Sequence, residues 1–255
     1  MPSRSRPRKE SSGICNPKLK KLKLLHITKN AGTALEKLGK ELGMKWGKQW
    51  KELQIHRGKL HPPHAGRLRS EWWHVPPQFF VEDPYSGYVP FAVVRCPYTR
   101  AISEFRCCWK GYCAPVGMDE TKKCRRKEAT SLDLNRWLQQ KLSPKAIQPP
   151  HQNAHFIPQH LYIFDAEGKP YVAKENLVRF EHLTEDLAKL GVHHGIDFPP
   201  LPRVNESEMP KFSVEDLDQV TRDLIESGFA KDFDLLGFQR LDPTRSGKGP
   251  LHADH

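Results

Sequence analysis

A short loop of small residues offers the groups needed to bind a phosphate. Residues 28–33 (TKNAGT) stand between an apolar segment and a segment whose leucines recur at helical spacing. Small residues allow backbone N–H groups to face a ligand, and the following helix contributes the positive end of its dipole. Lys29 supplies a charge and Thr33 a hydroxyl. The order differs from a Walker loop, because Lys29 precedes Gly32.

A second set of polar residues follows another apolar run, residues 89–94. Arg95 comes directly after this run, and Ser103 and Arg106 are three positions apart on the helix that the sequence predicts next. Ligands of open α/β sheets bind at the carboxyl ends of the strands, so these three residues could hold a second phosphate. The alternative for Arg100 and Arg106 is a solvated helix face.

Two strand–loop–helix units must position these groups. The pattern predicts a strand over residues 18–27 with a helix over 34–42, and a buried strand over 89–94 with a helix over 98–109. For residues 46–84 the sequence predicts mostly loop with short elements. The expected fold is α/β, a single domain with a P-loop-like central parallel sheet flanked by helices.

The later part of the chain predicts shorter elements and a tail. They are a helix over 131–142, a hairpin of 161–164 and 171–173, a strand over 176–180, a helix over 184–190 capped by Thr184 and closed by Gly191, and a helix over 213–227 capped by Ser213. We expect a disordered basic tail over residues 1–20, the α/β domain over 21–240 and a polar tail over 241–255.

Composition excludes several classes of protein. The 255 residues carry a formal charge of +11, and residues 1–23 hold eight basic side chains against Glu10 alone. A basic tail on a mildly basic body therefore fits better than a nucleic-acid-binding coat. No segment approaches the roughly 18–20 apolar residues of a membrane span, and the beginning of the sequence has no secretory signal. Collagen, coiled coils and small disulfide scaffolds are excluded.

The two motifs resemble a known family. HITKNAGTALEKL and VVRCPYTRAISEFR, in this order, are similar to the two cofactor signatures of the sulfotransferases, most closely the carbohydrate O-sulfotransferase branch that includes the heparan sulfate 2-O-sulfotransferases. The resemblance implies 3′-phosphoadenosine 5′-phosphosulfate (PAPS) as co-substrate, no metal, and a hydroxyl acceptor, in that branch a carbohydrate. It implies a 3′-phosphate site at Arg95 and Ser103. The implied 5′-phosphosulfate site comprises Lys29, Asn30, Ala31, Gly32, Thr33 and Ala34.

Sulfuryl transfer also needs charge stabilisation and a base for the acceptor hydroxyl. Lys29 is the expected electrostatic stabiliser. His74 lies between the two motifs, where relatives of the 2-O branch carry a catalytic histidine, and its Trp and Pro neighbours favour a neutral imidazole. A packing role for His74 is the alternative, and His56 and Glu52 are the other candidates for the base.

Two further groups of residues have open roles. Cys107, Cys108, Cys113 and Cys124 fall within eighteen residues and are either free thiols or a local disulfide or metal clip. An anionic glycan could meet a basic loop and tryptophan side chains. These residues are Lys110, Lys122, Lys123, Arg125, Arg126, Lys127, Trp72, Trp73 and Trp109. We expect His155 and His160 to be structural or to contact the acceptor.

Two other functions fit the sequence less well. A nucleic-acid-binding protein without catalysis would use the basic residues, but no nucleic-acid-binding motif is present. A kinase would need a Walker loop and a magnesium-binding carboxylate after a strand. The absence of a signal or anchor favours a soluble cytoplasmic protein, with the Golgi lumen as the alternative if the N-terminus is incomplete. The sequence assigns no oligomeric state.

Overall fold

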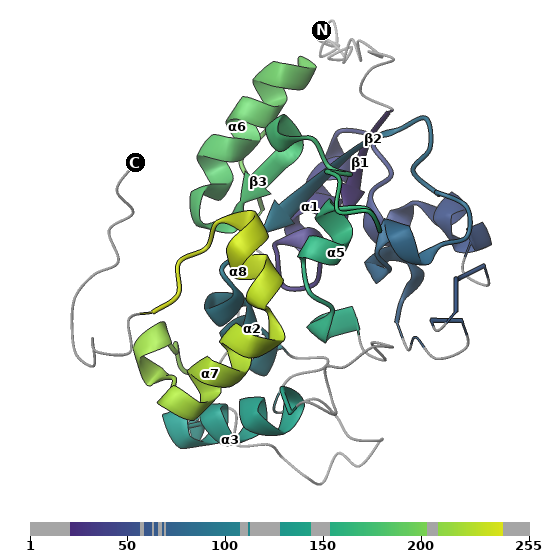
Figure 1. The fold of residues 1–255 in the computed structure, drawn as a ribbon. Helices are drawn as coiled ribbons and strands as arrows, with labels where there is room; N and C mark the ends of the chain where they lie inside the picture. The colour runs from purple at the N-terminus through teal and green to yellow at the C-terminus, as the bar shows by residue number, and fades with distance from the viewer. Residues whose placement is uncertain are drawn as a thin grey trace, which may run out of the picture.

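A three-stranded parallel sheet in the order β1-β2-β3 forms the centre of the molecule (Figure 1). The strands are β1 (Leu22–Leu25), β2 (Val89–Val94) and β3 (Leu177–Arg179). The structure, a computed structural model, describes residues 21–56, 59–62, 64–65, 68, 70–107, 112, 128–143, 154–202 and 209–241. The predicted single-domain α/β fold with a parallel sheet between helices is confirmed.

Other elements cover both faces of the sheet. Alternate side chains of β2 point to opposite faces and pack against different elements. Phe91 and Val93 pack with helices α1 (Gly32–Glu41) and α6 (Leu183–His194). Ala92 and Val94 pack on the other face with short helices, including α5 (His160–Ile163), and with the end of α8 (Ala230–Leu236). Burial on both sides explains why β2 is a continuous apolar run.

A second layer of helices packs below the sheet in Figure 1. Helices α2 (Pro97–Phe105), α3 (Ser131–Lys141) and α7 (Gln219–Gly228) share one apolar cluster, which includes Phe105 and Ile225. Helix α3 begins as its sequence predicts, because Thr130 and Asp133 form a reciprocal capping box. This layer fixes α2, the helix that follows Arg95.

Short 3-10 helices connect the larger elements. The predicted loop region after α1 contains η2 (Gly47–Gln49), η3 (Lys51–His56), η4 (Trp72–His74) and η5 (Pro77–Phe79), as expected. The later ones are η7 (Ala154–Phe156), η8 (Lys174–Asn176), η9 (Phe180–His182) and η10 (Val214–Asp216). No described helix is both long and apolar enough to cross a membrane.

The predicted hairpin at residues 161–164 and 171–173 is wrong. The first segment is helix α5, and the second meets it only through a bridge between Phe164 and Pro170 and bonds to Ile163 O. A distant residue explains the difference: the Asp232 carboxylate accepts the backbone N–H groups of Gln159 and His160, both at 2.8 Å. It thus satisfies the donors at the start of α5.

Several predicted boundaries also need correction. The strand over 18–27 is limited to Leu22–Leu25 among the described residues, the first helix begins at Gly32, and α2 ends at Phe105 instead of 109. Helix α6 has no side-chain cap from Thr184, and it continues through Gly191 to Gly195, which has φ 66°. Gly191 serves packing instead, since a Cβ there would lie 2.4 Å from Ile196 O.

The predicted helix over 213–227 is two elements. Ser213 and Asp216 form the expected capping box, but on η10. Helix α7 starts separately, with the Asp218 side chain accepting the Thr221 N–H. The strand predicted over 176–180 is confirmed as β3. The two predicted tails fall almost entirely outside the described residues.

Candidate active site

The loop after β1 has an unusual backbone. Lys29 and Ala31 have φ of 67° and 61°, and they are the non-glycine residues with positive φ in the described part of the chain. The left-handed conformation costs an L-residue about 1–2 kcal/mol, and such strain concentrates at functional sites. Ala31 is the N-cap of α1 and makes no side-chain bond there. The turned backbone and the first N–H groups of α1 together suit an anion.

A buried histidine that the sequence did not single out explains Gly32. A Cβ at Gly32 would lie 1.9 Å from His26 Nε2, so only glycine fits without moving this ring. The His26 ring is held by a 2.7 Å bond between Nδ1 and Glu36 Oε1, which also accepts the Lys48 N–H. The glycine of the loop is therefore required by packing.

Arg95 connects the two motifs. It follows β2, and its Nη1 donates to Lys29 O at 3.0 Å while Nε donates to Thr99 Oγ1 at 3.0 Å. The guanidinium also lies 3.9 Å from the centre of the Phe180 ring, just after β3. Burial lowers the pKa of Arg95 to about 10, which leaves it charged at neutral pH. The carboxyl ends of all three strands thus meet at this side chain.

Ser103 and Arg106 continue the α2 face on which Thr99 lies. Ser103 is half-buried, and Arg106 is close enough for its charge to contribute to the lowered pKa of Arg95. Arg106 Nη2 donates to Met209 O at 3.4 Å, whereas its buried Nε has no hydrogen-bond partner. An unpaired buried donor beside the half-buried Arg95 favours an anion at this place.

Arg100 does not lie on a solvated face, contrary to one prediction from the sequence. It is 4% exposed and donates to Thr28 O, Thr28 Oγ1, His155 O and Ile157 O. All four acceptors are oxygens of the loop after β1 or of the segment before α5. Arg100 therefore joins α2 to both segments.

Gln159 is the second functional candidate that the sequence did not indicate. Its Oε1 accepts from Asn30 Nδ2 at 2.7 Å and from the Arg95 N–H at 2.9 Å, and its Nε2 donates to Arg95 O at 2.8 Å. The Asn30 amide also donates to Val93 O, so this side chain points inward. Fully buried, Gln159 fixes both phosphate-site candidates to one another.

His74 lies against the loop that follows β1. Its Nδ1 donates to His26 O at 3.0 Å, and the two imidazole rings are 4.3 Å apart. Burial, followed by the nearby His26 and His155, holds the pKa of His74 well below its ordinary value of 6.5. A carbonyl only accepts, so in the neutral ring the proton is on Nδ1 and Nε2 carries the lone pair. This is the tautomer of a general base.

The other candidates for the base have different surroundings. The exposed Glu52 carboxylate pairs with Lys45 at 2.9 Å, and His56 lies 3.9 Å from Glu82. Trp72 is buried in the core and is therefore unavailable to stack on a sugar, whereas Trp73 is partly exposed. The candidate acceptor residues Trp109, Lys110, Lys122, Lys123, Arg125, Arg126 and Lys127 lie outside the described residues, as do Cys108, Cys113 and Cys124.

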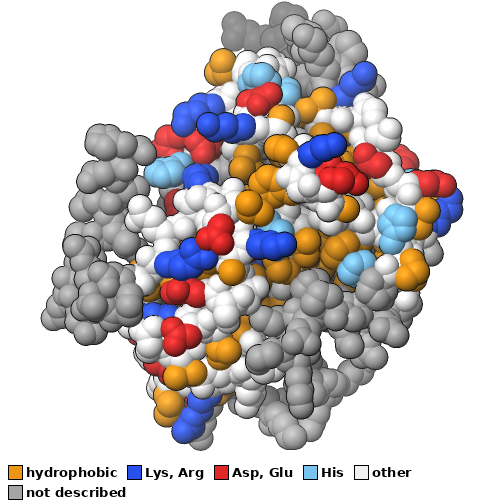
Figure 2. Space-filling view, in the orientation of Figure 1, with side chains coloured by type: hydrophobic (Ala, Val, Ile, Leu, Met, Phe, Trp, Pro, Cys, Tyr) orange, Lys and Arg blue, Asp and Glu red, His pale blue; other side chains and the backbone are white. Residues whose placement is uncertain are grey.

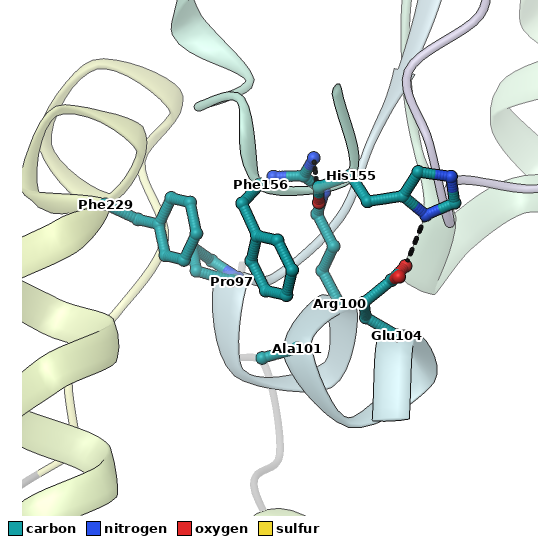
Figure 3. Close-up of a pocket in the computed structure, with 7 residues that line it drawn as sticks. All are labelled: Pro97, Arg100, Ala101, Glu104, His155, Phe156 and Phe229. Carbon is teal, nitrogen blue, oxygen red and sulfur yellow. Dashed lines mark hydrogen bonds and ion pairs between the residues drawn. The ribbon is translucent and has the colours of Figure 1, made fainter. Parts of the chain in front are cut away.

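His155 and His160 pair with buried carboxylates. His155 Nδ1 is 2.8 Å from Glu104 Oε2, and His160 Nδ1 is 2.7 Å from Asp232 Oδ1. Figure 3 shows that His155 and Glu104 border a hollow beside α2 that is otherwise lined by Pro97, Arg100, Ala101, Phe156 and Phe229. Neither the loop after β1 nor Arg95 lines this hollow, so it is distinct from the candidate phosphate sites.

The fold and the site together define an α/β protein with candidate ligand-binding groups at the carboxyl ends of its parallel strands. A model of the sulfotransferase family matches residues 14–239. The chain belongs to the sulfotransferase family, which assigns it to sulfuryl transfer in general. Neither the comparison with curated proteins nor that with solved structures found a match.

Proposed function

We propose that the protein transfers a sulfuryl group from PAPS to a hydroxyl of a carbohydrate. The observation that carries the proposal is the 3.0 Å bond from Arg95 Nη1 to Lys29 O. It brings the two motifs, which are 66 residues apart in the chain, into contact at one edge of the sheet. This is the arrangement needed to hold the two phosphate-bearing ends of one nucleotide.

The residues present fit the co-substrate. Lys29 and the backbone N–H groups of residues 31–33 would hold the 5′ end, with Thr33 adding its hydroxyl. The Ala34 N–H already donates to Ala31 O at 2.9 Å, so Ala34 would only border this end. Asn30 would contribute its backbone, because its side-chain amide already donates to Val93 O and Gln159 Oε1. Arg95 and Ser103 would hold the 3′-phosphate, and the unpaired Arg106 Nε is a further donor for it.

The chain supplies the remaining parts of the reaction. Bound PAPS would supply an activated sulfuryl group, whose sulfur bonds to the acceptor oxygen as its bond to the nucleotide phosphate breaks. The Lys29 ammonium would stabilise the negative charge that moves toward the phosphate. Nε2 of neutral His74 would take the proton from the acceptor hydroxyl.

The carbohydrate class of the acceptor is supported by the resemblance to the carbohydrate branch and by one feature near His74. The Trp73 ring is partly exposed, and its centre is 5.5 Å from that of His74. A sugar face stacked on this indole would bring its hydroxyls close to the imidazole.

Binding of the product nucleotide, 3′-phosphoadenosine 5′-phosphate, tests the proposal. Loss of a charge-assisted contact costs roughly 1.5–3 kcal/mol, so Lys29→Ala and Arg95→Ala should each weaken binding about ten- to a hundredfold in calorimetric titration. Lys37→Ala, an exposed lysine of α1, is the matched control and should bind as the wild type does.

Adenosine 5′-phosphate separates the two sites. Arg95→Ala should weaken the binding of this ligand much less, since it has no 3′-phosphate. An equal loss for both nucleotides would reject the 3′ assignment of Arg95, and unchanged binding in both variants would reject the proposed site.

A further inference from the structure

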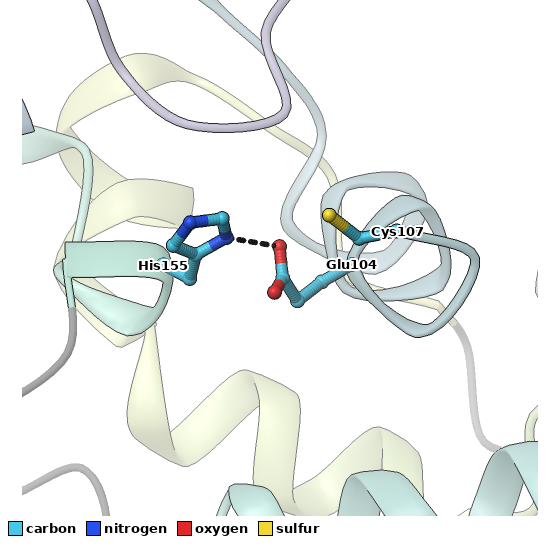
Figure 4. Close-up of side chains that lie close together, drawn as sticks. All are labelled: Glu104, Cys107 and His155. Atoms are coloured by element: carbon cyan, nitrogen blue, oxygen red, sulfur yellow. Dashed lines mark hydrogen bonds and ion pairs between the residues drawn. The ribbon is translucent and has the colours of Figure 1, made fainter. Parts of the chain in front are cut away.

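Three side chains that the proposed reaction does not use meet beside α2. Figure 4 shows Glu104 and Cys107, from the end of α2, facing His155 of η7. One ligand atom from each lies within 4.8 Å of the other two. Glu104 and Cys107 are buried, and Cys107 is a free thiol. A carboxylate, a thiol and an imidazole are the three side-chain types that bind zinc most often.

The buried Glu104 carboxylate has an unsatisfied oxygen. Its Oε2 is paired with His155 Nδ1, whereas Oε1 has no hydrogen-bond partner although the residue is 1% exposed. Leaving such an acceptor unpaired costs about 1–3 kcal/mol, more for a charged group. A cation at this place would remove that cost. The unpaired Glu104 oxygen favours a bound cation, and this observation is separate from the proximity of the three side chains.

We propose that Glu104, Cys107 and His155 form a site for a divalent metal ion, with zinc as the expected ion. Zinc lies at about 2.0–2.2 Å from nitrogen and oxygen ligands, so a tetrahedral pair of these atoms is about 3.4 Å apart. The 2.8 Å between His155 Nδ1 and Glu104 Oε2 must therefore widen by about half an ångström. Rotation of the side chains would supply this and bring the three ligand atoms, now within 4.8 Å of one another, around one ion. The adjoining hollow would admit a water as fourth ligand.

The proton and charge balance fits the surroundings. Metal binding takes the proton from the Cys107 thiol to solvent, and the proton shared between Nδ1 and Glu104 moves to His155 Nε2 or to solvent. The thiolate and the carboxylate then neutralise the ion. Affinity must consequently fall as the pH falls, because protons compete for the same atoms.

The site would have a structural role. It joins the end of α2 to η7, and the chain from η7 leads within three residues to Gln159, which holds Asn30 and Arg95 together. A metal ion would thus fix the segment that aligns the two phosphate-site candidates. This proposal is independent of the proposed reaction, since metal binding is measured without nucleotide or acceptor.

Cobalt titration of the full chain, after treatment with a chelator, tests the site. Wild-type protein should bind one Co²⁺ with a thiolate-to-metal charge-transfer band in the near ultraviolet, and Zn²⁺ should displace it. Cys107→Ser should abolish the band, while Cys96→Ser, which replaces the other described free thiol, should retain it. A wild type without the band, or a band unchanged in Cys107→Ser, would overturn the proposal.

Substitution of the other two proposed ligands tests the site even if Cys107→Ser does not fold. Glu104→Gln and His155→Gln preserve size and should each weaken Co²⁺ binding at least about 100-fold, since loss of outer-shell partners alone costs 10–100-fold. Circular dichroism of each metal-free variant verifies its fold. Wild-type affinity in both folded variants would mean that the ion binds elsewhere, and the site would be rejected.

Discussion

His74 combines a half-buried side chain with a backbone acceptor on one nitrogen. Protonation would place a cation in partly desolvated surroundings, 4.3 Å from the His26 ring and 6.0 Å from the His155 ring. Both effects lower the pKa of His74, so the charged form appears only well below pH 6.5. The neutral imidazole that the proposed base requires is thus present throughout the physiological range.

We expect His74→Ala to lower turnover by about 10²–10⁴-fold, the usual contribution of a general base. Affinity for the product nucleotide should remain that of the wild type, because the role proposed for His74 is toward the acceptor hydroxyl. In the wild type, kcat should decline only on the acid side, below pH 6.5, as the imidazole protonates; the variant should lack this limb. Steady-state kinetics over a pH series measure both effects.

Glu52→Ala and His56→Ala are the controls for this substitution and should keep most of the turnover. If either variant loses turnover while His74→Ala does not, the base lies in η3 and the similarity to the 2-O branch is misplaced.

The place of the two motifs in the fold could be predicted from sequence, because each motif is a short continuous segment. Arg95 follows β2 directly and Lys29 lies four positions after β1, which is sufficient to place them near the carboxyl edge of a sheet. Gln159 and Arg100 could not be predicted in the same way. Gln159 meets Asn30 across 129 positions, and Arg100 meets Thr28 across 72, and neither contact leaves a periodic pattern. The roles of all these residues remain predictions until binding is measured.

At the scale of elements, the contact between α8 and α5 stabilises the backbone at Gln159, next to the candidate site. Asp232 of α8 is fully buried and accepts from the Gln159 and His160 N–H groups, besides pairing with His160 Nδ1 at 2.7 Å. One carboxylate therefore caps α5 and holds the backbone of Gln159.

Asp232→Asn should destabilise the protein by about 1–3 kcal/mol for each buried N–H left without an acceptor. Product-nucleotide binding should weaken as well, since Gln159 loses its support. Asp234→Asn is the matched control two residues away: Asp234 is exposed and pairs with Arg240, so its loss should cost less than about 1 kcal/mol. Urea unfolding of the three proteins gives the comparison. Equal stability of Asp232→Asn and wild type would contradict the capping role.

The same contact explains which elements sequence patterns could predict. Strands β1 and β2 are specified by their own apolar residues, and α3 by its own cap at Thr130. Helix α5 has four residues and depends on a carboxylate 72 positions away, so its segment resembles a strand when taken alone. Short elements stabilised by distant partners are those that local patterns predict wrongly.

At the scale of the whole molecule, charge is unevenly distributed along the chain. On the face in Figure 2, basic and acidic side chains of the described residues lie among one another, with no extended basic patch. The longest basic segment, residues 1–23, lies almost wholly before β1. We propose that residues 21–240 form the functional domain, with tails on either side.

Deletion of residues 1–20 removes six basic side chains and Glu10. We expect the unfolding midpoint and product-nucleotide affinity to remain those of the full chain, because β1 begins at Leu22. Retention on a DNA column should fall, with a shallower salt dependence, since each phosphate contact contributes roughly 0.9 to the logarithmic slope. Undiminished retention on DNA would instead favour a nucleic-acid-binding function of the domain itself.

The Gln159 amide has a consequence for ligand selection. Its bonds to Asn30 and to the backbone of Arg95 set the separation of the two proposed anion sites in the absence of a ligand. A ligand then gains from both sites only if its own two charged ends match this fixed span. Because the side chains of both sites are already ordered, binding costs little conformational entropy. The fixed span therefore selects ligands by the distance between their two charged groups. Moving the ribose phosphate from the 3′ to the 2′ oxygen keeps the charge and changes the span, so such an isomer would bind like a nucleotide without that phosphate.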